Sequence, residues 1–120
     1  MIARLAKVPD VVRGAWWTVR AVREARRRLS AQGLAGFTLT PPPALPPSAE
    51  RGVRLVLRRL SPSCLERALV LQTWLAAHGR AHDVVVGVRK AGRDFRAHAW
   101  IDVEESWQRG DYREITRLGP

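Results

Sequence analysis

The stretch from Ser61 to Gly79, SPSCLERALVLQTWLAAHG, restricts the fold more than any other part of the sequence. Ser63 and Glu66 have the S-x-x-E spacing of a helix capping box, and Gly79 is a typical stop signal. The residues between them are apolar on nearly every side of a helix, which is typical of a helix buried inside a domain. We therefore predict a central helix here, against which the other elements pack.

The periodicity of the hydrophobic residues changes to two after this helix. Residues 83–89 (DVVVGVR) predict a β-branched strand, a turn at Gly92 follows, and residues 95–103 (FRAHAWIDV) predict a second strand. A shorter third strand is expected at residues 111–116. Helices followed by an antiparallel meander that packs on the buried helix indicate an α+β fold.

Two further helices are expected before residue 61. The first is capped by Asp10 and runs to about Leu29. Its apolar stripe consists of Val12, Trp16, Val19, Val22 and Leu29. The second is capped by Ser48. Its inward-facing residues are Val53, Val56, Leu57 and Leu60.

Five prolines between residues 40 and 48 predict an extended, polyproline-like connector between these two helices. The chain of 120 residues is long enough for one packed domain. Within it we expect a basic helical segment (1–39), the proline-rich connector (40–48) and a core (49–120) that carries the chemistry.

The charge is strongly positive, with 21 Lys and Arg against 11 Asp and Glu. This net positive charge favours an anionic partner such as nucleic acid, a membrane surface or an acidic polypeptide. The alternative is that the arginines only keep a small domain soluble. The single cysteine excludes an internal disulfide and a cysteine-rich zinc site. The sequence has no apolar run that could span a membrane and no secretory signal pattern, so a cytoplasmic location with a reduced thiol is expected.

Cys64 occupies the first position of the predicted central helix. Unpaired backbone N–H groups and the positive end of the helix dipole favour an anion there, and the thiolate is the reactive form of cysteine. His98, on the more polar face of the second strand, is the candidate base that would activate this thiol. The alternative is that Cys64 is a small buried hydrophobic residue and His98 an ordinary half-buried one.

A third group should orient the imidazole of His98. Asp102 is near in sequence, but four residues along a strand span about 13 Å. If Glu104 and Glu105 form the tip of a hairpin, Asp111 lies directly opposite His98, with Cβ atoms about 4.5–5.5 Å apart. Asp111 is therefore preferred over Asp102.

The segments CLERALVLQTWLAAHG, VVVGVR and FRAHAWID together resemble the transglutaminase-like, papain-related fold. More narrowly, they are similar to the B2 proteins of lasso-peptide biosynthesis, which are leader peptidases. The resemblance covers roughly residues 50–118 and rests on the C-L-x-R-A-L start together with the F-x-A-H-A-W strand. The residues before position 50 do not match the family pattern.

Carried over to this chain, the family pattern implies a catalytic triad. Cys64 corresponds to the nucleophile, His98 to the general base and acid, and Asp111 to the orienting aspartate. Trp100 matches the tryptophan that follows the histidine, whereas Asp102 stands at a non-catalytic position. The implied reaction is attack of the thiolate on a leader-peptide carbonyl and hydrolysis of the thioester, without a cofactor or a metal.

The transition state of this reaction needs donors for its oxyanion. The backbone N–H of Cys64 is the expected first donor, and Gln72 is a candidate for the second. The resemblance also implies partners: the leader region of a precursor peptide as substrate, a separate leader-binding protein of the B1 type, and the lasso cyclase as a further candidate. Nucleic acid is not expected as a partner.

Three alternatives remain open. A transglutaminase would use the same three residues with an amine as the acceptor. A non-enzymatic basic module would bind nucleic acid through the arginine-rich helices, although the sequence has no recognisable motif for nucleic-acid recognition. A zinc site at His78 and His82 has the spacing i, i+4, but no third ligand is evident.

Overall fold

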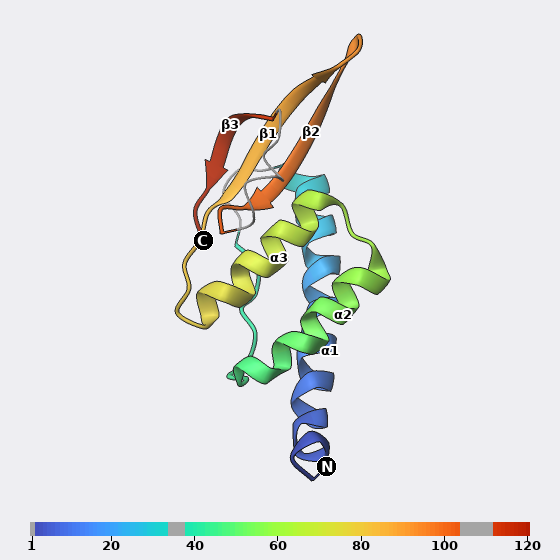
Figure 1. Cartoon of the computed structure of the whole chain (residues 1–120), viewed down its shortest axis with the longest axis vertical. Helices are drawn as coiled ribbons and strands as arrows, with labels where there is room; N and C mark the ends of the chain where they lie inside the picture. Colours follow the sequence, from blue (N-terminus) through green and yellow to red (C-terminus); the bar gives the residue numbers. More distant parts are fainter. Residues whose placement is uncertain (1, 34–37, 104–111) are drawn as a thin grey trace. The chain divides into compact units, whose positions relative to one another are not determined.

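The structure is a computed structural model that describes residues 2–33, 38–103 and 112–120. The chain forms two compact units, Met1–Pro62 and Ser63–Pro120, and Figure 1 labels their elements. Each unit contains part of the segment 49–120 that the sequence assigned to a single core. The expected segments 1–39, 40–48 and 49–120 therefore do not coincide with the two units.

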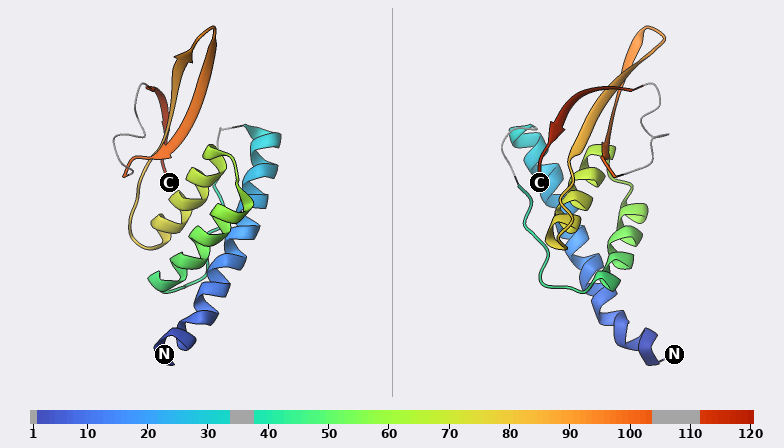
Figure 2. Two further views of the ribbon diagram at one scale, coloured as in Figure 1. Left: turned by 45° about the vertical axis from the view of Figure 1, so that its right-hand side comes forward. Right: turned by 60° about the vertical axis from the view of Figure 1, so that its left-hand side comes forward.

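The first unit contains α1 (Ile2–Gln32), the short helix η1 (Pro47–Ala49) and α2 (Glu50–Leu60). Figure 2 shows α1 and α2 side by side, in agreement with their many contacts. The prediction that Asp10 caps the first helix is wrong, because α1 begins at Ile2 and continues through Pro9. The sequence signal at Asp10 lies inside a longer helix.

The buried face of α1 differs from the expected apolar stripe. Val22 is fully buried as predicted, but Val12 is 59% and Trp16 is 65% exposed. The residues buried in their place are Thr18, Ala21 and Ala25, together with Trp17. Mostly small side chains therefore face the interior, which lets a second helix approach closely.

The contact between α1 and α2 depends on a glycine. Gly52 of α2 lies against the backbone of Val11 and Ala15, where an added Cβ atom would collide with both residues. Ser48 does not cap α2, because it lies within η1 and the N-cap is Ala49, which makes no side-chain cap bond.

The inward face of α2 is largely as predicted. Val53 and Leu57 are buried and Val56 is half-buried, whereas Leu60 is 40% exposed. α2 therefore contributes its apolar side to the interior of the first unit.

The proline-rich segment packs along α1, and its last residues, from Pro47 on, belong to η1. Leu39 and Leu45 are buried. The indole Nε1 of Trp17 donates to the carbonyl of Thr40 (3.1 Å), and the Glu24 carboxylate accepts from both the amide (2.6 Å) and the hydroxyl (2.9 Å) of Thr40. The connector is thus a packed part of the first unit.

The second unit begins with α3 (Cys64–Ala77), which confirms the predicted helix and its largely buried character. The capping box is present at its start. At its end Gly79 has φ +75°, and the amides of Gly79 and Arg80 donate to the carbonyls of Ala76 and Leu75, which is the Schellman pattern. The local stop and start signals of this helix were therefore read correctly from sequence.

The sheet of the second unit consists of β1 (Val84–Ala91), β2 (Asp94–Ile101) and β3 (Arg113–Leu118), all antiparallel to their neighbours. α3 packs against β1 and β2. Helices and an antiparallel sheet together confirm the α+β class. Among the described residues, no helix has the length and apolar character that crossing a lipid bilayer would require.

The strand order is β2-β1-β3, which corrects the predicted meander. β3 pairs with β1 instead of β2, with Val88 opposite Arg113 and Val86 opposite Thr116. A β-bulge interrupts this pairing between Val86 and Gly87. The hairpin between the second and third strands, from which the sequence placed Asp111 opposite His98, is therefore not formed.

Candidate active site

The capping box fixes the position of Cys64 as the first residue of α3. The Ser63 hydroxyl accepts from the Glu66 amide (3.1 Å), and the Glu66 carboxylate accepts from the Ser63 amide (2.9 Å). An N-cap of this kind contributes about 1 kcal/mol to stability. It leaves the N–H groups of Cys64 and Leu65 without an acceptor in the described part of the chain. The half-buried free thiol thus lies beside two unused donors.

The sulfur of Cys64 lies against β2. Its Sγ accepts a hydrogen bond from the Ala99 amide at 3.4 Å, a contact between residues 35 positions apart. Ala99 directly follows His98, and β1 pairs with the other side of this strand. The start of α3 therefore meets the outer edge of β2 at the residue next to the candidate histidine.

The His98 ring lies among aromatic side chains. It stacks on Trp100, with ring centroids 5.7 Å apart and planes inclined by 25°, and it lies 5.4 Å from the ring of Tyr112. The guanidinium of Arg89 lies 5.2 Å above the centroid of Tyr112. Such contacts limit the rotation of the half-buried imidazole. A catalytic base needs a fixed direction of this kind.

Gly87 makes room for these rings. It is the residue of β1 that faces both His98 in β2 and Glu114 in β3. A Cβ atom at this position would lie only 2.8 Å from the Trp100 indole and 3.2 Å from the Arg113 carbonyl oxygen. A side chain there would have to displace either the indole or a neighbouring strand.

We expect Gly87→Ala to destabilise the fold by about 1–3 kcal/mol, the usual cost of forcing an extra methyl group into a packed site. Urea denaturation measures this change, and the near-ultraviolet circular dichroism of the tryptophans reports the displaced indole. Gly119→Ala is the matched control, because a Cβ atom there meets nothing within 4 Å. Equal stability of the two variants would show that Trp100 does not lie over Gly87.

Asp111 lies outside the described residues. Its proposed place opposite His98 loses its geometric basis, since β3 pairs with β1. What remains for Asp111 is its distance in sequence from His98, which matches the family pattern. Its assignment therefore stays a prediction.

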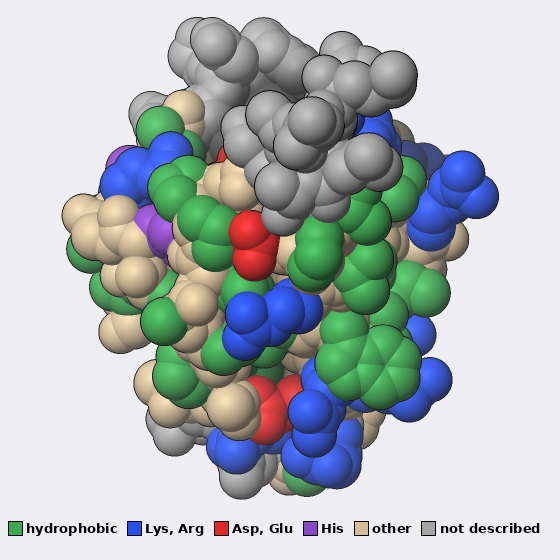
Figure 3. Space-filling model, turned by 90° about the horizontal axis from the view of Figure 1, so that it is seen from below, with side chains coloured by type: hydrophobic (Ala, Val, Ile, Leu, Met, Phe, Trp, Pro, Cys, Tyr) green, Lys and Arg blue, Asp and Glu red, His purple; other side chains and the backbone are tan. Residues whose placement is uncertain are grey.

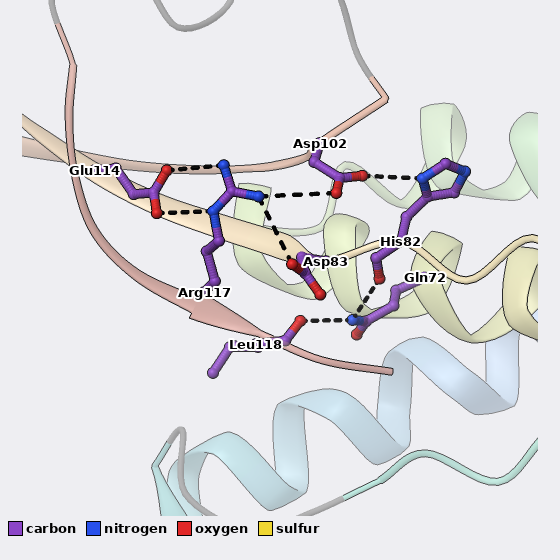
Figure 4. Close-up of polar contacts among 7 residues, drawn as sticks. All are labelled: Gln72, His82, Asp83, Asp102, Glu114, Arg117 and Leu118. Atoms are coloured by element: carbon purple, nitrogen blue, oxygen red, sulfur yellow. Dashed lines mark hydrogen bonds and ion pairs between the residues drawn. The ribbon is translucent and has the colours of Figure 1, made fainter.

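Asp102 is the other aspartate considered as the group that orients His98. Its contacts include His82, Asp83 and Arg117. Its carboxylate contacts His82 Nδ1 at 2.9 Å and Arg117 Nη1 at 3.8 Å, as Figure 4 shows. Its amide donates to the carbonyl of Asp83 at 3.0 Å. Asp102 thus ties the end of β2 to the residues that precede β1.

Arg117 is the centre of a polar network that the sequence did not reveal. Its guanidinium contacts Glu114 (2.8 Å), Asp83 (3.6 Å) and Asp102 (3.8 Å). The hydrogen bond to Glu114, followed by the nearby negative charges, raises the pKa of this already basic group. Only the pairing of β3 with β1 brings these residues together, and no local sequence pattern indicates that pairing.

Gln72 is not placed to donate to an oxyanion. Its buried side-chain amide donates to the carbonyls of His82 (3.0 Å) and Leu118 (2.8 Å), so it connects α3 with β3 (Figure 4). His78 Nδ1 contacts the Trp74 carbonyl at 2.8 Å, whereas His82 contacts an aspartate. Within the described ranges, no group of three metal-ligating side chains is present.

Tyr112 and Gly87 are the residues of the site that sequence reasoning missed. Tyr112 could have been noticed as the aromatic residue next to Asp111, but its contact with His98 depends on the strand order. Gly87 carried a weak signal, since a glycine inside a strand often marks a close approach.

The sequence was compared with known proteins. The sequence model of the transglutaminase-like superfamily matches residues 15–118. This confirms the expected transglutaminase-like fold and extends the match through most of α1. Searches of the curated proteins and of the solved structures found no match.

Proposed function

Because the chain belongs to the transglutaminase-like superfamily, which includes cysteine peptidases and acyltransferases, we propose that it is a cysteine peptidase. Its proposed substrate is the leader region of a lasso-peptide precursor. The observation that supports this best is the hydrogen bond between the Cys64 sulfur and the amide next to His98. The C-L-x-R-A-L and F-x-A-H-A-W motifs favour the lasso-peptide leader peptidases within the superfamily.

In the proposed reaction His98 takes the proton of the Cys64 thiol, and the thiolate attacks the scissile carbonyl carbon of the leader. The tetrahedral intermediate collapses to a thioester as His98 protonates the leaving amine. Water, deprotonated by His98, then attacks the thioester and releases the carboxylate together with the thiol. Asp111 is proposed to hold the imidazole in the required orientation.

The start of α3 supplies the electrostatic part of this proposal. The free N–H groups of Cys64 and Leu65 belong to the first turn, where the helix dipole favours negative charge. Oxyanion donors in acyl transfer are commonly backbone amides of this kind, and the loss of one donor costs about 10²–10³-fold in rate. Since Gln72 is engaged elsewhere, Leu65 replaces it as the candidate second donor.

A separate leader-binding protein is proposed as the partner, because the resemblance of the C-L-x-R-A-L and F-x-A-H-A-W motifs to the lasso-peptide leader peptidases implies one. The lasso cyclase is a further candidate partner. We expect cleavage of the precursor to be slow with this protein alone and much faster when the leader-binding protein is added.

Mass spectrometry of the precursor, incubated with and without the leader-binding protein, tests the function. The expected product is a free leader that ends in a carboxylate. A product in which an added amine is joined to the acyl group, without hydrolysis, would assign transglutaminase activity. An uncut precursor under both conditions would refute the proposal.

A further inference from the structure

A groove runs along α1 in the first unit. It encloses about 920 Å³, and it is lined by residues 12–27 of α1 on one side and by residues 40–43 of the proline-rich segment on the other. The two walls are joined by the hydrogen bonds of Trp17 and Glu24 to Thr40. We call this feature the arginine groove.

The arginine groove has an uncompensated positive charge. Arg13, Arg20, Arg23 and Arg27 line it and are exposed, and none of them has an ion pair within the described residues. The one acidic side chain in its lining, Glu24, already accepts two hydrogen bonds from the connector. Figure 3, which views the molecule from below, shows basic and hydrophobic side chains next to one another on that face. An acidic ligand would complement the positive charge of this lining.

The groove also exposes apolar surface. Trp16 is 65% and Val12 is 59% exposed, and the rings of Pro41 to Pro43 line the opposite wall. Tryptophan and arginine are the residues most enriched among those that dominate binding energy at protein interfaces. A ligand for this site therefore needs an apolar side chain as well as negative charge.

The spacing along α1 indicates the form of the ligand. At about 100° per residue, Val12, Trp16 and the four arginines lie within about 100° of one another around the helix. Arg13, Arg20 and Arg27 follow one another at intervals of seven residues, which is about 10.5 Å along the axis. Acidic residues at heptad spacing on a second helix would match this row.

We propose that the arginine groove binds an amphipathic helix of a partner protein. Acidic side chains of that helix, at heptad spacing, face Arg13, Arg20 and Arg27, and a large apolar side chain contacts Trp16 and Val12. A single-stranded nucleic acid fits less well, because its binders stack successive bases on several aromatic side chains, and the groove exposes one. The inference uses only the first unit and does not depend on the proposed peptidase activity.

The test uses the full chain and a fluorescein-labelled synthetic helix of about 18 residues, which spans about 27 Å. The peptide carries Glu at every seventh position beside a stripe of Leu. Fluorescence anisotropy should show saturable binding of this peptide, and none of the same peptide with Lys in place of Glu. Absence of binding by the acidic peptide would overturn the proposal. Tighter binding by a single-stranded oligonucleotide or by anionic lipid vesicles would overturn it as well.

Matched variants locate the binding site. Trp16→Ala and Arg20→Glu should each weaken the affinity by about tenfold or more, the size of loss found at interface hot spots. Arg58→Glu makes the same charge reversal, and Leu55→Ala truncates another exposed apolar side chain, both on α2 outside the groove. Their affinities should stay within about twofold of the wild type. An equal loss in Arg20→Glu and Arg58→Glu would show that net charge alone controls binding.

Discussion

Replacement of Cys64 by alanine is expected to lower leader cleavage by about 10⁴-fold or more, as removal of the nucleophile does in other triad enzymes. The melting temperature should change little, because Cys64 is half-buried and its capping residues remain. Product formation from the precursor, measured by mass spectrometry, gives the rate. Ser63→Ala is the control at the same helix end. It should cost about 1 kcal/mol of stability and lower the activity far less than Cys64→Ala does.

The same assignment can be checked without a mutation, since Cys64 is the only cysteine of the chain. Alkylation with iodoacetamide should add one label, and activity should fall in proportion to the labelled fraction seen in the intact mass. The precursor should slow the labelling. A fully labelled protein that still cleaves the precursor would exclude Cys64 as the nucleophile.

The second large effect is expected from a comparison of two aspartates. Asp111→Asn should lower turnover by about 10⁴-fold, the loss seen when the orienting aspartate of a triad becomes an amide. Asp102→Asn should leave turnover intact and cost about 1 kcal/mol of stability, because its carboxylate binds His82 and Arg117. Rates measured together with thermal melts separate the two outcomes. An active Asp111→Asn variant beside an inactive Asp102→Asn variant would reverse the assignment.

The sequence predicted the features that local interactions determine. The capping box at Ser63 and Glu66 and the stop at Gly79 act within one turn of helix, so their pattern is sufficient to recognise them. These local signals also placed Cys64 at the first position of α3. The positions of β1 and β2 were predicted, but the expected alternation along β2 is wrong, because its first four residues are exposed and its last three are buried.

Features that depend on distant contacts were not predicted. Large apolar residues suggested a stripe through Val12 and Trp16, but α2 packs on the side of α1 with small side chains, where the two backbones can approach. The pairing of β3 with β1 was missed because a turn signal indicates where a chain reverses and not which strand it joins. The network around Arg117 was missed with it.

The central position of β1 has a consequence for the order of folding. β1 and β2 are joined by a tight turn at Gly92, whereas about 25 residues separate Val88 from its partner Arg113 in β3. Pairing between distant strands loses the entropy of closing the loop before any contact forms. We therefore expect β3 to join the sheet after the hairpin of β1 and β2 has formed. Tyr112 precedes β3 and supplies one of the aromatic neighbours of His98. The contact of the Cys64 sulfur with β2 can therefore form early, whereas the aromatic surroundings of the His98 imidazole are completed in a late folding step.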